Sequence, residues 1–414
     1  MSELPQGSAA LQRIVVLGAG FAGLWSAIGA ARKLDELAIG PERIEVTLVD
    51  RSTYHSIRVR NYEAELDGTR VLLDDILRPI GVRRVEAEVS DIDFAHRRVI
   101  FSGDAEPLVY DRLVLALGSR LVRPPLPGLD AYAFDVDTYD GGSRLNAHIA
   151  KLPARERTPG QWSALVVGGG LTGIETATEM PGRLRGALGG GSGIPRVVIA
   201  DRQPWIGSDM GEEARGVIDE ALSSLGIEKR PGISIAAVDA DGATLSNGER
   251  IDAATIVWCA GMQAHPLTRR FPVEHDRFGR VPVDQFLKIK GMAAEFAAGD
   301  VAWFPINGTR SSVMSCQHGR PMGRFAGHNV VCDLLSLPML PLRIDWYTTI
   351  LDLGPWGAVY TVGWDRHVET KGAAAKRTKI VINRERIYPP RSGDRREILD
   401  AAAPVVQTPP TLFH

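Results

Sequence analysis

Cysteine is scarce in this sequence of 414 residues, which contains only Cys259, Cys316 and Cys332. Three scattered cysteines are too few for a disulfide framework, and no pair has the C-x-x-C spacing or the spacing of metal ligands. We therefore expect no structural disulfide, no metal site and a reducing, cytoplasmic setting.

Long apolar runs and an excess of one charge are also missing. No run of about 18 apolar residues occurs, so no segment is expected to span a membrane, and residues 1–11 predict a loose tail rather than a signal peptide. The 48 basic and 50 acidic residues give a formal net charge of −2, which does not suggest a nucleic-acid partner. The basic stretch 376–396 predicts a solvated face or a surface that touches anionic lipid, so membrane association is at most peripheral, at the inner face of the membrane.

A glycine motif near the start of the chain is the first strong positive signal. The apolar run Ile14–Leu17 leads into Gly18, Gly20 and Gly23, and a segment of apolar and small residues follows. This pattern predicts a buried strand, a tight turn and a helix. In that arrangement Gly18 permits the turn, Gly20 leaves room for a pyrophosphate at the helix N-terminus, and Gly23 allows close packing. The alternative is an ordinary glycine-rich turn.

The same motif occurs a second time. The apolar run 164–167 leads into Gly168, Gly170 and Gly173, with the third glycine at the same offset as before. Two such motifs in one chain suggest two bound nucleotides.

Each motif is followed by a strand that ends in an acidic residue. These strands are predicted at 44–50 and 196–201, and Asp50 and Asp201 are candidates to hold ribose hydroxyls. Asp201 would repel a 2′-phosphate and so favours NADH over NADPH, although Arg202 beside it could accommodate that phosphate and leaves the choice open.

With these parts in order, the sequence resembles the pyridine nucleotide-disulfide oxidoreductase family, and within it the type II NADH:quinone dehydrogenases. The resemblance covers about residues 13–332. Besides the two glycine motifs it rests on the stretches 110–119, 255–261 and 295–300. It implies that Gly118, Gly261 and Gly299 line the cofactor sites and that Asp300 binds the ribityl and phosphate part of FAD.

The resemblance implies an α/β fold with two Rossmann-like dinucleotide-binding domains and a small C-terminal α+β region. The expected division is 1–125 for the first part of an FAD-binding domain, 126–278 for an NAD(P)H-binding domain, 279–338 for the second part of the FAD domain, and 339–414 for the C-terminal region.

The positions of the cysteines limit the chemistry. Disulfide reductases of this family need cysteines against the flavin, and no cysteine precedes Cys259. The resemblance therefore implies that a hydride passes from NAD(P)H to FAD and that electrons leave directly to an acceptor.

Three residues are candidates for the catalytic site. Gln317 matches the first glutamine of a helix that abuts the flavin in quinone-reducing relatives, whereas their Gln-Gln pair falls here on Pro321 and Met322, which leaves a quinone acceptor open. His318 could gate protons or be structural. Glu175 matches a family glutamate near the nicotinamide and flavin, or it is simply an acid in the first turn of a helix.

The predicted function is an FAD-dependent NAD(P)H dehydrogenase, NADH being favoured, with a quinone-like or other small electron acceptor. The alternatives are a flavoenzyme acting on a specific organic substrate, a reductase of a small iron–sulfur protein, and a non-catalytic FAD-stabilised binding protein. The sequence leaves open whether the protein forms a homodimer.

Overall fold

The computed structural model describes residues 10–155, 157–306 and 310–413, so most of the predicted N-terminal tail lies outside the described residues. A five-stranded parallel sheet forms around the first glycine motif. Its strands, in spatial order, are β21 (Glu295–Ala297), β9 (Arg112–Leu115), β1 (Gln12–Leu17), β2 (Ile44–Asp50) and β5 (Arg83–Glu86).

Continuous apolar runs explain this sheet, because central parallel strands are covered on both faces. Residues 14–17 of β1 are fully buried, and helix α1 (Phe21–Glu36) follows directly, as predicted. Strand β21 enters the sheet beside β9, so the chain returns to the first sheet after an excursion of well over a hundred residues.

Helix α7 (Cys316–Leu334) packs along α1 through a stripe of glycines. A Cβ atom at Gly323 would lie 2.3 Å from the Ala22 carbonyl oxygen, and one at Gly327 would lie 2.2 Å from that of Ser26. Because glycine has no side chain, the two helix backbones can approach closely at these positions. This close contact fixes the rotation of α7 about its axis.

A second five-stranded parallel sheet forms around the second motif. Its strands, in spatial order, are β11 (Ala133–Phe134), β18 (Thr255–Trp258), β12 (Ser163–Val167), β13 (Arg196–Asp201) and β14 (Ile227–Pro231). Helix α5 (Leu171–Leu188) follows β12, and α4 (Tyr139–Lys151) and α6 (Glu212–Ser224) are further helices of this part. The α/β architecture with two Rossmann-like parallel sheets is confirmed.

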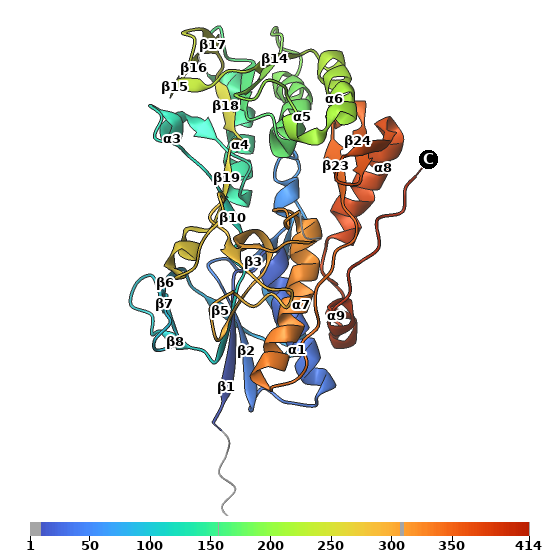
Figure 1. Ribbon diagram of the computed structural model, residues 1–414. Helices are drawn as coiled ribbons and strands as arrows, with labels where there is room; N and C mark the ends of the chain where they lie inside the picture. The colour runs from blue at the N-terminus through green and yellow to red at the C-terminus, as the bar shows by residue number, and fades with distance from the viewer. Residues whose placement is uncertain (1–9, 156, 307–309, 414) are drawn as a thin grey trace, which may run out of the picture.

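A narrow connection joins the two sheets, which occupy the lower and upper halves of Figure 1. Strand β10 (Ser119–Leu121) pairs antiparallel with β19 (Met262–Ala264) at this connection. Strand β10 follows β9 of the first sheet, and β19 follows β18 of the second sheet. The two segments in which the chain crosses between the sheets therefore lie side by side.

The C-terminal region forms a small α+β unit along one side of the molecule (Figure 1). Strands β23 (Thr348–Asp352), β24 (Ala358–Val362) and β25 (His367–Lys371) make an antiparallel sheet, and α8 (Gly372–Val381) follows. A π-helical turn over Ile382–Arg386 and helix α9 (Arg395–Ala401) come next. Ile387, Tyr388 and Ile398 are buried in the same core as the first sheet.

Shorter elements complete the fold. They are β3 (Tyr54–Ser56) with β4 (Arg70–Leu72), α2 (Leu73–Leu77), β6 (Val89–Asp93), β7 (Arg98–Phe101) and β8 (Leu108–Val109), α3 (Leu129–Tyr132), β15 (Ile235–Asp239), β16 (Gly242–Leu245) and β17 (Arg250–Asp252), and β20 (Val281–Pro282) with β22 (Ala302–Trp303). No helix within the described residues is long and apolar enough to cross a membrane.

Candidate active site

The first glycine motif forms an open cradle at the N-terminus of α1. Gly18 has a φ of +99°, which suits glycine, and Gly20 is the N-cap of α1 without a side-chain cap. A Cβ at Gly20 would meet no atom within 4 Å, whereas one at Gly23 would lie 1.7 Å from the Gly18 carbonyl oxygen. Gly20 therefore keeps space open above the uncapped backbone N–H groups of α1, whereas Gly18 and Gly23 pack closely against backbone.

Asp50 holds this turn in place. Its Oδ2 accepts a hydrogen bond from the Ala19 backbone N–H at 2.7 Å, and Oδ1 accepts one from Ser52 at 2.8 Å. Burial raises the pKa of Asp50, and these hydrogen bonds oppose that effect. Its carboxylate thus lies at the edge of the cradle, where a ribose hydroxyl would be expected.

His55 also touches the turn. It is fully buried in β3, and its Nδ1 lies 2.8 Å from the Ala19 carbonyl oxygen, to which it donates in the neutral ring. Burial lowers the pKa of His55 to about 4, so the ring is neutral at neutral pH.

The second motif repeats this geometry at α5. Gly168 has a φ of +117°, Gly170 is again an uncapped N-cap with open space around it, and a Cβ at Gly173 would lie 1.8 Å from the Gly168 carbonyl oxygen. Asp201 accepts hydrogen bonds from the backbone N–H groups of Gly169 and of Gln203, the latter at 2.6 Å.

A polar group lies where β9 and β21 end. The Ser119 hydroxyl donates to Asp300 Oδ2 at 2.6 Å, and Arg58 donates to Ser119 Oγ at 3.0 Å and also pairs with Asp137. Burial raises the pKa of Asp300 against the effects of Ser119 and Arg58. Gly118 and Gly299, beside these residues, both have positive φ, and Gly261 lies at the start of β19 in the neighbouring crossing. The ends of β9 and β21 thus bring Gly118, Gly299 and Asp300 to one end of the first sheet, whereas Gly261 follows β18 at the end of the second sheet.

The first turn of α7 carries the predicted Gln317 and His318. Gln317 Nε2 is buried without a hydrogen-bond partner among the described residues, so it can donate to a bound group. His318 is fully buried, and its Nδ1 accepts from the Val313 backbone N–H at 2.9 Å. Burial lowers the pKa of His318 to about 4, so the ring is neutral near neutral pH, and its Nε2 is buried without a hydrogen-bond partner among the described residues. Burial also raises the pKa of the Cys316 thiol, in keeping with a packing role.

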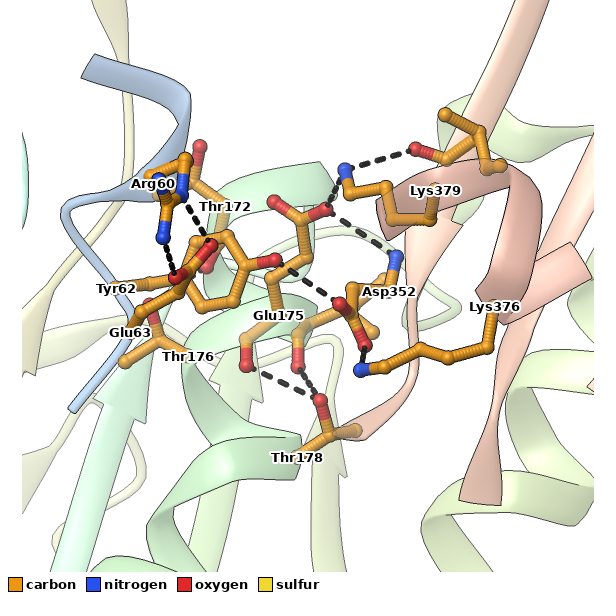
Figure 2. Close-up of polar contacts among 12 residues, drawn as sticks. Arg60, Tyr62, Glu63, Thr172, Glu175, Thr176, Thr178, Asp352, Lys376 and Lys379 are labelled. Atoms are coloured by element: carbon orange, nitrogen blue, oxygen red, sulfur yellow. Dashed lines mark hydrogen bonds and ion pairs between the residues drawn. The ribbon is translucent and has the colours of Figure 1, made fainter. Parts of the chain in front are cut away.

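Glu175 lies in a buried cluster of charges between α5 and the C-terminal unit (Figure 2). Its Oε1 accepts from Lys379 Nζ at 2.6 Å and from the Asp352 backbone N–H at 3.2 Å. The Asp352 carboxylate in turn accepts from the Tyr62 hydroxyl at 3.1 Å and pairs with Lys376. Four segments that are remote in the sequence therefore meet at this glutamate.

The charges of this cluster balance one another. Burial raises the pKa of Glu175, and Lys379 offsets only part of that effect. Burial disfavours the ammonium of Lys379, but Glu175 and Asp352 outweigh it and raise the pKa of that lysine. Both hydrogen bonds of the Glu175 carboxylate use Oε1, so Oε2 makes no hydrogen bond to the described residues and can face a ligand.

The sequence missed the partners of Glu175. The stretch 376–396 was expected to be a solvated or lipid-touching face, and that expectation is wrong for Lys376 and Lys379, which turn toward buried carboxylates. The positive charge of this stretch did not indicate buried lysines, since a basic run usually lies in water. Only the spacing of Lys376 and Lys379, three residues apart on one helix, indicated that both could face the same partner. Within the described residues, no group of three or more His, Cys, Asp or Glu side chains could hold a metal ion.

Comparison with known proteins identifies the family. The model of the pyridine nucleotide-disulphide oxidoreductase family matches residues 12–323. An NADH dehydrogenase-like protein of Mycobacterium tuberculosis (strain H37Rv) is 55% identical over 97% of this chain and 100% of its own length. A type II NADH:quinone oxidoreductase of Staphylococcus saprophyticus is 26% identical over 88% of this chain and 92% of its own. The structure of NDH2 from Plasmodium falciparum in complex with NADH has a similar fold, with a TM-score of 0.75 at 13% identity, covering 94% of this chain and 97% of that one.

This chain belongs to the pyridine nucleotide-disulphide oxidoreductase family. It is an oxidoreductase, and its cofactors are FAD and a nicotinamide nucleotide, as the resemblance implied. The residues fit both groups, because each glycine turn keeps a space open in front of an uncapped helix N-terminus and ends beside a carboxylate.

Proposed function

We propose that this protein is an FAD-dependent NADH dehydrogenase that passes two electrons to a quinone-type or similar small acceptor. The observation that carries the proposal is the repeated open cradle, at Gly18–Gly23 and at Gly168–Gly173, in a chain without a cysteine pair beside either one. The overall reaction is NADH, a proton and the oxidised acceptor giving NAD⁺ and the two-electron-reduced acceptor. When bound, FAD supplies the ring that accepts a hydride and returns electrons to the acceptor.

We assign the two cradles to the two cofactors. The domain around the first sheet, which we assign to residues 1–125 and 279–338, would hold FAD, with its diphosphate on the N-terminus of α1 and hydroxyls on Asp50 and Asp300. The second sheet, within 126–278, would hold NADH, with a ribose on Asp201. Residues 339–414 would form the separate C-terminal region that contributes Asp352 and Lys379 around Glu175.

The side chains then have distinct tasks. Gln317, with an unpartnered amide N–H, would orient the flavin ring by a hydrogen bond. Glu175 would use its available oxygen at the nicotinamide side, and Lys379 would keep a countercharge beside it. Because the pKa of Glu175 is raised, this carboxyl could hold a proton at a higher pH than an exposed glutamate.

The name of the staphylococcal relative supports a quinone acceptor, although this chain has Pro321 and Met322 where a Gln-Gln pair was sought. If the acceptor is a quinone dissolved in the lipid, the enzyme would have to bind the cytoplasmic surface of the membrane as a peripheral protein.

Anaerobic mixing of the purified protein with NADH tests the proposal directly. We expect rapid bleaching of the visible flavin band, slower bleaching with NADPH, and reoxidation by a soluble quinone. A protein without flavin, or a flavin that neither nucleotide bleaches, would contradict the proposal. Reoxidation by ferredoxin alone, with strong salt dependence, would favour a reductase of an iron–sulfur protein.

A further inference from the structure

Two arginines of α7 are buried without a countercharge. Arg320 and Arg324 are only 5% and 2% exposed. Their guanidinium carbons lie 5.2 and 4.3 Å from the ring centre of Trp25 on α1, so both stack over one buried indole. A single aromatic face stabilises a cation by a few kcal/mol at most, far less than the cost of removing two charges from water.

No acidic group compensates them. Neither arginine makes a hydrogen bond or an ion pair with the described residues, and the Nε atoms of both, together with Trp25 Nε1, are buried without a partner. Residues 21–34 and 316–332 contain no Asp or Glu, so neither helix can supply one nearby. An unpaired buried charge is strongly destabilising, which indicates that an anionic partner is missing from this group.

A third cation faces the same place from the C-terminal segment. Arg386 lies in the π-helical turn and donates to the Thr408 carbonyl oxygen. Burial lowers the pKa of Arg324 to about 9, and Arg320 and Arg386 lower it further by repulsion. Burial likewise lowers the pKa of Arg320 to about 10. Arg386 thus repels both Arg320 and Arg324, and Arg320 also repels Arg324.

The arginines lie on the predicted acceptor side of α7. Arg320 follows Gln317 by three residues and Arg324 follows Arg320 by four, so the three side chains form one stripe along the helix. The donor groups along this stripe that lack partners are Gln317 Nε2 and the two arginine Nε atoms. In Figure 1, α9 and the final segment of the chain lie beside α7 and α1.

We propose that Arg320 and Arg324 form the binding site for an anionic electron acceptor, a ring compound that carries an ionised hydroxyl or a carboxylate. This inference rests on the proposed function and narrows it, because it makes the acceptor acidic instead of neutral. Guanidinium groups suit this role, since they bind carboxylate and phenolate oxygens with directed, charge-assisted hydrogen bonds. The indole N–H of Trp25 supplies one more donor in the same group.

The test compares two naphthoquinones of the same ring size. One is 2-hydroxy-1,4-naphthoquinone, an anion at neutral pH, and the other is 2-methyl-1,4-naphthoquinone, which is uncharged. Binding of each to the oxidised, FAD-loaded protein is measured by isothermal titration calorimetry without NADH. The ratio of kcat/KM for the two compounds is measured separately with NADH.

The variants separate the effect of the arginine charges from other effects of substitution. Arg320→Gln and Arg324→Gln remove it, Arg320→Lys and Arg324→Lys keep it, and Arg396→Gln removes an arginine from α9 whose side chain is 92% exposed. We expect the wild-type protein to prefer the anion, and each Gln variant to lose roughly tenfold to a hundredfold of anion affinity, as expected for a charged hydrogen bond. The neutral quinone should change by less than about threefold, and the Lys variants and Arg396→Gln should keep the preference for the anion.

Three results would overturn the inference. They are no preference for the anion in the wild-type protein, equal losses for both quinones in the Gln variants, and loss of bound FAD from those variants, which would assign the arginines to the cofactor instead. Flavin bleaching by NADH in the wild-type protein separates the two proposals. If bleaching fails while anion binding depends on Arg320 and Arg324, the dehydrogenase proposal falls and the anion site stands.

Discussion

Glu175 and Lys379 are 204 positions apart in the sequence, yet their side chains form a buried ion pair with an oxygen-to-nitrogen distance of 2.6 Å. The pair fastens the C-terminal unit to helix α5, whose N-terminus forms the second cradle (Figure 2). Any shift of the C-terminal unit would leave one of these charges buried alone. Glu175, which we propose as an active-site residue, is therefore positioned by a part of the chain that the glycine motifs do not include.

The first prediction concerns the stability that this pair provides. Lys379→Met should lower the free energy of unfolding by about 3–5 kcal/mol, because it leaves the Glu175 carboxylate buried without its cation. The double variant Glu175→Gln with Lys379→Met should recover much of that loss, since no charge is then stranded. Urea unfolding followed by circular dichroism measures both.

Lys371→Met is the matched control, because Lys371 pairs with Glu220 on the surface at 3.3 Å. Its cost should be about 0–1 kcal/mol. Equal effects of the two lysine substitutions would show that the Glu175–Lys379 pair does not anchor the C-terminal unit.

The second prediction separates the tasks of two glycines in the first motif. Gly20→Ala should change the stability of the protein without FAD by no more than about 0.5 kcal/mol, because the new methyl group meets no protein atom. It should nevertheless weaken FAD binding by at least roughly tenfold, since the methyl group occupies the space left for the diphosphate.

Gly23→Ala should reduce both quantities. Its methyl group would lie 1.7 Å from the Gly18 carbonyl oxygen, so the turn must move before the helix can form. Thermal unfolding and flavin release by dilution distinguish the two variants. Normal FAD affinity in Gly20→Ala would mean that the diphosphate does not lie at this turn.

The third prediction concerns nucleotide choice at the second motif. Asp201→Asn keeps an oxygen to accept from the Gly169 N–H but removes the charge that repels a 2′-phosphate. The ratio of kcat/KM for NADH over NADPH should therefore fall by at least roughly tenfold. Arg202→Ser is the control with the opposite expectation, because it removes a cation that could bind the phosphate. An unchanged ratio in Asp201→Asn would remove Asp201 from the ribose site.

The fourth prediction is a loss of stability in acid that depends on His318. The pKa of His318 is lowered by burial to about 4 in the folded protein, against 6.5 for an exposed histidine. The unfolded chain therefore binds more protons between these values, so stability is complete above pH 6.5 and is lost as the pH falls toward 4. His318→Gln should reduce the slope of unfolding free energy against pH by up to about 1.4 kcal/mol per pH unit in this range.

His367 provides a control of opposite sign. Its pKa is raised by the hydrogen bond and charge of Glu213, so the protonated form contributes stability below pH 6.5 that is lost as the pH rises. His367→Gln should therefore leave the loss between pH 6.5 and 4 unchanged and remove a decline in stability above pH 6.5. Urea midpoints at pH 8, 7, 6 and 5 give both slopes, and equal slopes in His318→Gln and the wild-type protein below pH 6.5 would contradict the assignment.

Much of the first-order architecture could be read from local pattern. Apolar runs 14–17 and 164–167, each followed by glycines at fixed offsets, predicted two strand–turn–helix units, and both are present. These features depend on backbone conformations and burial patterns that a few adjacent residues impose.

The partners of the candidate site residues depend on segments that are distant in the sequence. The residues next to Glu175 in the sequence do not indicate that Lys379 neutralises it. Likewise, the residues next to Arg320 do not indicate that this arginine lacks an acidic partner. His318 illustrates the same point, because only the enclosing structure lowers its pKa and keeps the ring neutral near neutral pH.

Residue type and spacing along short stretches were enough to specify the two parallel sheets, the two open glycine turns and the absence of a cysteine pair. Which charges are paired and which are left alone depends on the folded chain as a whole. The energy of a buried charge depends on every group that folding brings within a few ångströms of it, and those groups come from α1, α5, α7 and the C-terminal unit.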